Sequence, residues 1–323
     1  MRDTHTTTLK FSEGKTSWGI GGSLGDGSRV TPGAVKQAFW DGPVQVDGQL
    51  NIDPTVDQKG AALRGRLSGE GSLLMRSGWL HLTHPANDFA GAIGVSPSAS
   101  ARYQNFERGL AVYANGALPL SCRQVAVTNS PVMLLEASQF DLPALTFLVP
   151  AATNQAFSSD GAAARGTLAG LRKLGDGMLS YAVPLAVTGV LEVAEGGLDL
   201  NGKSLSAGTL AMAGGAVKGD IRVTQGMAFA SGAYANGALK VLSVDGAVAF
   251  GEGVVLDLDE LVSGAYPFSP RYGDHLVLQT TGGITGVPVL DRDSAAYQAG
   301  WRCGVKDGSL YVMRHAGTSL IFR

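Results

Sequence analysis

Charge is scarce in this chain. Only 16% of the residues are Asp, Glu, Lys or Arg, whereas about 25% is usual in a soluble domain. The 25 basic residues are scattered among 27 acidic ones, which leaves a net charge of −2. No basic cluster occurs that could follow a phosphate backbone. This composition excludes nucleic acid as an expected partner.

Long apolar runs are also lacking. No stretch of about 18 apolar residues could form a membrane-spanning helix, and the first five residues contain no signal-peptide core. We therefore expect no direct membrane insertion of this chain. For an exported protein, we expect the signal peptide to lie outside the given sequence.

Cysteine is rare, and metal or cofactor motifs are missing. Cys122 and Cys303 are too few for a disulfide framework or a cysteine-rich metal site, and they either pair or remain free. His81 and His84 form an H-x-x-H pair, but no nearby Glu or Cys completes a zinc site. No P-loop or dinucleotide fingerprint stands in the required context. We expect no metal and no cofactor.

Glycine, by contrast, is abundant. The chain has 46 Gly among 323 residues, about twice the usual share. No Gly-x-y period runs through it, so collagen is excluded. Hydrophobic residues make up 45%, which argues against disorder. Glycine therefore indicates ordered turns or close backbone approaches.

The main pattern has a period of two, which predicts short strands. Val44, Val46, Leu50 and Ile52 all fall on even positions. The same alternation returns in the pairs Leu80/Leu82, Leu191/Val193, Leu198/Leu200, Leu210/Met212, Ile221/Val223, Val248/Phe250, Leu256/Leu258, Leu276/Leu278, Leu310/Val312 and Leu320/Phe322. Asn-Gly and Asp-Gly dipeptides lie between many of these strands, and residues 185–259 leave no room for crossover helices. This pattern predicts an all-β chain that forms a stacked β-solenoid.

The expected organisation is one solenoid with a terminal cap. We assign residues 1–268 to the solenoid, with an irregular excursion at about 117–165, where Pro119, Pro131, Pro143 and Pro150 occur. Residues 99–115 carry apolar side chains at helical spacing and predict a short helical insertion. A short turn is expected at 294–298. Residues 269–323 contain Trp301 and four strand-like pieces, and we expect them to cap the stack.

Two segments resemble the autotransporter-associated β-strand repeat of bacterial surface proteins. The first runs through Leu67-Ser68-Gly69-Glu70-Gly71-Ser72-Leu73, Gly78-Trp79-Leu80-His81-Leu82 and Asn87-Asp88-Phe89-Ala90-Gly91. The second is Gly170-Leu171-Arg172-Lys173-Leu174-Gly175-Asp176-Gly177-Met178-Leu179, which lacks the Asn-x-Phe-x-Gly tail. The resemblance implies a right-handed parallel β-helix, a secreted or cell-surface location in a Gram-negative bacterium, and no catalytic residues.

Two classes of function stay open. The first is a non-catalytic surface passenger that serves as a stalk or binds host glycans or mucus glycoproteins. The alternative is a carboxylate-dependent hydrolase or lyase that acts on a polysaccharide or a glycoprotein such as mucin. Asp257 and Asp259 share one strand face about 7 Å apart, which suits an acid/base pair. Glu192 and Asp199 point outward and could stack on neighbouring turns, where each would raise the other's pKa.

Overall fold

The structure, a computed structural model, forms two compact units. Unit 1 comprises Met1–Leu171 and Gly177–Leu185, and unit 2 comprises Arg172–Asp176 and Ala186–Arg323. Within them the structure describes residues 9–11, 15–20, 37–40, 42–54, 60–76, 78–96, 108–160, 165–230, 232–235, 238–259 and 273–314.

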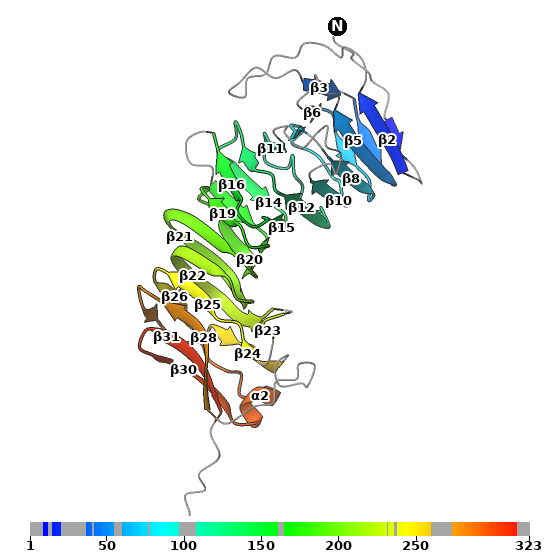
Figure 1. Ribbon diagram of the computed structural model, residues 1–323. Helices are drawn as coiled ribbons and strands as arrows, with labels where there is room; N and C mark the ends of the chain where they lie inside the picture. Colours follow the sequence, from blue (N-terminus) through cyan, green and yellow to red (C-terminus); the bar gives the residue numbers. More distant parts are fainter. Residues whose placement is uncertain are drawn as a thin grey trace, which may run out of the picture. The chain divides into compact units, whose positions relative to one another are not determined.

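Unit 1 is built from three columns of parallel strands, which Figure 1 shows as stacked arrows. The first column contains β1 (Leu9–Phe11), β4 (Val44–Val46) and β7 (Leu67–Ser68), and further along the chain β14 (Gln139–Leu142) and β17 (Arg165–Leu168). The second contains β2 (Lys15–Ile20), β5 (Gln49–Pro54), β8 (Ser72–Met75), β10 (Ala92–Val95), β12 (Gln124–Thr128) and β15 (Leu145–Leu148). The third contains β3 (Gln37–Trp40), β6 (Gly60–Leu63), β9 (Trp79–Leu82), β11 (Gly109–Val112), β13 (Val132–Leu134), β16 (Asn154–Ser159) and β19 (Met178–Tyr181). Residues 83–91 and 113–123 form no strand of the first column, but turn after turn adds a parallel strand to the second and third columns, so the fold is the predicted β-solenoid.

Unit 2 also consists mainly of parallel strands, and those that follow β18 (Leu171–Leu174) in the chain are longer. They are β20 (Ala186–Val193), β21 (Gly197–Met212) and β22 (Ala216–Phe229). Successive parts of β22 pair in parallel with β25 (Leu242–Asp245), β26 (Val248–Phe250) and β27 (Val255–Leu256). Within unit 2, this one strand therefore takes part in three columns of parallel strands. A small antiparallel hairpin of β23 (Tyr234–Ala235) and β24 (Ala238–Leu239) projects before β25.

The last strands of unit 2 change direction. β28 (Gly273–Thr280) pairs in parallel with β25 and antiparallel with β31 (Ser309–Arg314), which pairs antiparallel with β30 (Trp301–Lys306). β29 (Ile284–Thr285) and the helix α2 (Ala295–Gln298) lie between β28 and β30 in the chain. The turn expected at 294–298 is confirmed by α2. The predicted strand pair Leu320/Phe322 and the predicted boundary at 268/269 lie outside the described residues.

The core lies inside the turns and follows the period-two pattern. Register places Leu50, Leu73, Ile93, Val125 and Leu145 in one row, and each is at most 1% exposed. Burying each such side chain stabilises the fold by roughly 1.5–3 kcal/mol. The alternation thus places apolar side chains inward on strand after strand.

Glycine fills corners where successive turns touch. A Cβ on Gly71 would stand 2.1 Å from the carbonyl oxygen of Gly48, and one on Gly91 would stand 2.0 Å from that of Gly71. The amide of Ala92 donates to Gly71 O at 2.9 Å. Any side chain at these corners would push the turns apart, which explains part of the glycine excess.

Two local expectations are wrong where the structure describes them. The helix expected over 99–115 is contradicted for 109–112, which form β11, because Leu110 pairs with Leu80 on one side and Val132 on the other. Residues 99–107 lie outside the described residues. The irregular excursion expected over 117–165 is contradicted for 124–159, which forms β12 to β16 in register with neighbouring turns. The prolines stand between these strands, where no ladder hydrogen bond is lost.

Candidate functional site

Asp257 and Asp259 both accept hydrogen bonds from backbone N–H groups of unit 2. Both are exposed, as expected from the alternation with Leu256 and Leu258. The Asp257 carboxylate accepts the backbone N–H of Asp259 at 2.9 Å, and the Asp259 carboxylate accepts that of Ala296, in the first turn of α2, at 3.3 Å. Each group thus has a local structural role in addition to any chemical one.

Glu192 and Asp199 do not stack on each other, so that expectation is wrong. Register places Glu192 beside Ala211 and Asp199 beside Lys218, because the two carboxylates belong to different columns. Glu192 pairs with Arg172 at 2.9 Å, and Asp199 pairs with Lys218 at 3.3 Å. A cation, rather than a second carboxylate, faces each of them.

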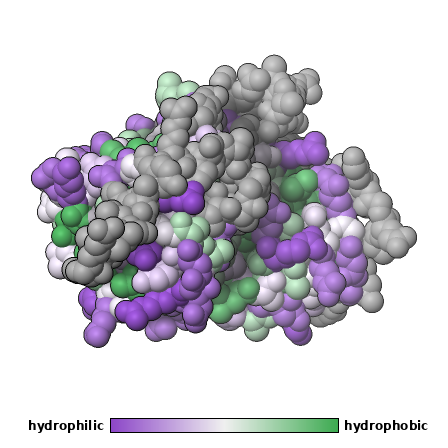
Figure 2. Space-filling view, turned by 90° about the horizontal axis from the view of Figure 1, so that it is seen from below, coloured by the Kyte–Doolittle hydropathy of each residue, from purple (hydrophilic) through white to green (hydrophobic). Residues whose placement is uncertain are grey.

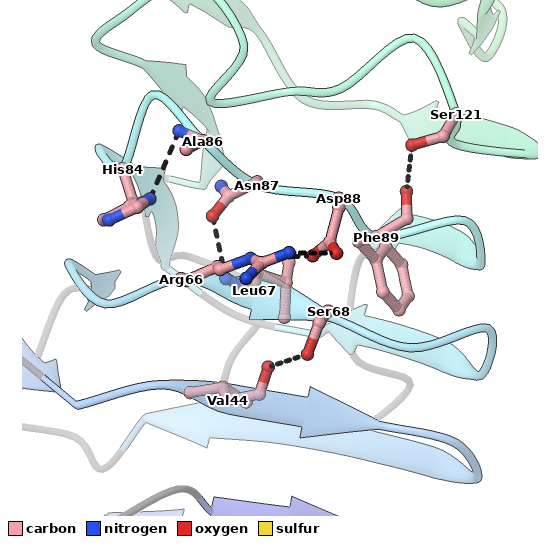
Figure 3. Close-up of polar contacts among 10 residues, drawn as sticks. All are labelled: Val44, Arg66, Leu67, Ser68, His84, Ala86, Asn87, Asp88, Phe89 and Ser121. Carbon is pink, nitrogen blue, oxygen red and sulfur yellow. Dashed lines mark hydrogen bonds and ion pairs between the residues drawn. The ribbon is translucent and has the colours of Figure 1, made fainter. Parts of the chain in front are cut away.

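The residues of the first repeat-like segment join successive turns (Figure 3). The side-chain oxygen of buried Asn87 accepts the N–H of Leu67 at 2.7 Å, and its amide nitrogen donates to Ala117 O at 2.8 Å. Buried Phe89 offers its carbonyl oxygen to the Ser121 hydroxyl at 2.9 Å. The Asn-x-Phe-x-Gly tail therefore links successive turns by hydrogen bonds, and these bonds of Asn87 and Phe89 are here called the bracket.

The polar side chains near this bracket also have partners close by in the fold. Arg66 forms an ion pair with Asp88, and both side chains are about half exposed. The His84 ring accepts the N–H of Ala86 at 3.2 Å. Exposed pairs of this kind contribute little stability, about 0–1 kcal/mol.

His81 forms a buried cluster on the outer side of β9. Its Nδ1 lies 2.8 Å from the Tyr113 hydroxyl, and the Trp79 ring lies 6.3 Å from the imidazole. His81 is 1% exposed, and burial, helped by the charge of Arg64, lowers its pKa to about 4. Sequence alternation placed His81 outward but gave no sign that this position is buried.

The two histidines of the H-x-x-H pair therefore have different partners. Among the described residues, no group of three or more His, Cys, Asp or Glu side chains could hold a metal ion. Cys122 and Cys303 are free thiols. Burial raises the pKa of Cys122 to about 12 and that of Cys303 to about 11.

A surface without charged residues covers one side of unit 1. It consists of the outward side chains of β8, β10, β12 and β15, here called the uncharged face: Ser72, Leu74, Ala92, Gly94, Gln124, Ala126, Thr128, Thr146 and Leu148. Its side chains are mostly small, and Leu148 is 41% exposed. Parallel strands about 4.8 Å apart make such a surface flat and regular.

Figure 2 shows hydrophilic residues interspersed with smaller hydrophobic areas among the coloured residues of one face. In the part of the chain that the structure describes, no helix has the length and hydropathy needed to span a membrane. Comparison with known proteins found no matching family model, no similar curated protein and no similar solved structure.

Proposed function

We propose that this chain is a non-catalytic, exported β-solenoid of a bacterial cell surface, similar to an autotransporter passenger. The observation that carries this proposal is the position of the repeat-like residues: Asn87 links successive turns by hydrogen bonds, and Gly91 allows two turns to approach closely. A scaffold needs such brackets, whereas an enzyme needs side chains that are available to a substrate. The surface location rests on the sequence resemblance.

The proposed activity is a structural stalk or adhesion to host glycans and mucus glycoproteins. Its contact surface would be the uncharged face, where small polar and apolar side chains offer hydroxyl and amide groups without charge. A flat strand surface suits an extended, neutral chain better than a compact anion.

Glycan and mucin arrays test the adhesive part. We expect binding by the unaltered protein and at least a tenfold loss in an Ala126→Glu variant, which places a charge in the middle of the face. Lys203→Glu, on an exposed residue of β21, is the matched control and should bind normally. Absence of binding to every glycan and mucin would leave only the stalk.

The alternative, a hydrolase or lyase using paired carboxylates, is tested with mucin, pectin-like polymers and casein between about pH 4 and pH 8. The account predicts no cleavage by the protein or by an Asp257→Asn/Asp259→Asn variant. Cleavage that disappears in this variant would establish the enzyme and overturn the scaffold proposal. Cleavage that persists would establish an enzyme whose site lies elsewhere.

A further inference from the structure

Lys173 occupies a core position that apolar residues hold in neighbouring turns. In β18 the side chains of Leu171 and Lys173 point inward, and Lys173 is 0% exposed. The amide of Ala194 donates to Lys173 O at 2.9 Å, which sets Lys173 beside Val193. The same inward row continues through Met212 and Phe229.

The ammonium group binds two backbone carbonyls at adjacent corners. Lys173 Nζ donates to Gly175 O in its own turn and to Glu195 O, at 2.8 Å, in the next. Gly175 follows Lys173 by two residues, and Glu195 follows Val193 by two residues, so the two acceptors occupy equivalent positions in successive turns. Burial lowers the pKa of Lys173, against the opposing effect of the Asp176 and Glu195 carboxylates.

Apolar rows alone fix the register of these turns weakly. Side chains repeat with a period of two, so a slip of two residues between β18 and β20 would leave the inward side chains of both strands pointing inward. The same slip moves Glu195 O by about 7 Å along the strand, beyond the reach of Lys173. A buried ammonium that loses one of its acceptors is strongly disfavoured.

We propose that Lys173 is a register lock, which selects one alignment of β18 with β20 by bridging the corner carbonyls of two successive turns. Single buried polar groups select register in other repetitive folds at some expense of stability. The inference concerns how unit 2 assembles, and it is independent of what the surface binds.

Disulfide trapping tests the lock. In a Cys122→Ser/Cys303→Ser background, Leu174→Cys with Ala194→Cys reports the observed register. Leu174→Cys with Glu192→Cys, and Arg172→Cys with Ala194→Cys, report slips of two residues in either direction. Each pair is oxidised with Lys173 in place and with Lys173→Met, which keeps the length and removes the charge. Lys203→Met, an exposed lysine, is the matched control.

With Lys173 or the Lys203→Met control, we expect the 174–194 pair to oxidise at least tenfold faster than either slipped pair. In Lys173→Met this preference should fall below threefold, while far-UV circular dichroism keeps its strand signal. An unchanged preference in Lys173→Met would overturn the lock. Loss of the strand signal in Lys173→Met would also overturn it, because Lys173 would then be required for stability rather than for alignment.

Discussion

Acid should destabilise unit 1 through His81, and the size of the effect can be worked out. The pKa of His81 falls from an ordinary 6.5 to about 4 in the fold. Between these values the unfolded chain binds a proton that the folded chain does not, so stability is full above about pH 6.5 and falls as the pH is lowered. The contribution lost is about 2 kcal/mol at pH 5 and about 3 kcal/mol at pH 4.

Urea unfolding between pH 4 and pH 7 measures this effect. The difference in unfolding free energy between pH 7 and pH 5 should be smaller in His81→Gln by about 2 kcal/mol, because glutamine does not titrate. His84→Gln is the control and should keep the full pH dependence. The same pH dependence in His81→Gln and the unaltered protein would refute the reasoning.

Three further predictions concern the turns and the thiols. Asn87→Ala should lower the unfolding free energy by about 2–4 kcal/mol, because two backbone groups lose their partner; a change below about 0.5 kcal/mol in urea unfolding would contradict the bracket. Gly91→Ala should destabilise by about 1–3 kcal/mol, and Gly94→Ala, whose Cβ would meet only the end of the Leu74 side chain, by less; equal melting temperatures would contradict the corner argument. Cys122 and Cys303 should react with Ellman's reagent at pH 8 at least about a hundredfold more slowly in the folded protein than in urea, and comparable rates would show that the thiols are exposed.

The period-two pattern predicts the inward side chains of most strands, but it is wrong at Leu276/Leu278: a register shift in β28 buries Val277 beside Leu278 and leaves Leu276 half-buried. Leu191 and Val193, like Leu198 and Leu200, are at most 1% exposed, as their spacing predicts. Alternation is a local property of the chain, so the sequence carries it directly. The excess of glycine pointed to corners for the same reason.

The contradicted expectations depend on contacts between turns. Leu110 has helical spacing to its neighbours in sequence, but strands on both sides pair with β11 and override that preference. Glu192 and Asp199 are close in sequence, yet the corner between them sends them to different columns. Register between turns cannot be read from either residue alone.

The roles of two polar residues were also hidden in the sequence. Lys173 stands between an arginine and a leucine and looks like an ordinary surface residue. Its two acceptors, Gly175 O and Glu195 O, are backbone atoms that only the fold brings together. His81 likewise reveals its burial only through neighbouring strands.

Parallel stacking of successive turns is tested most directly by the distance between Gln49 and Gln124. Register links these residues through Ser72 and Ala92, so three strand spacings, about 14 Å, separate their backbones. Spin labels on Gln49→Cys and Gln124→Cys, in the Cys122→Ser/Cys303→Ser background, should broaden each other's electron paramagnetic resonance spectrum. Spectra identical to the sum of the two singly labelled proteins would contradict the solenoid.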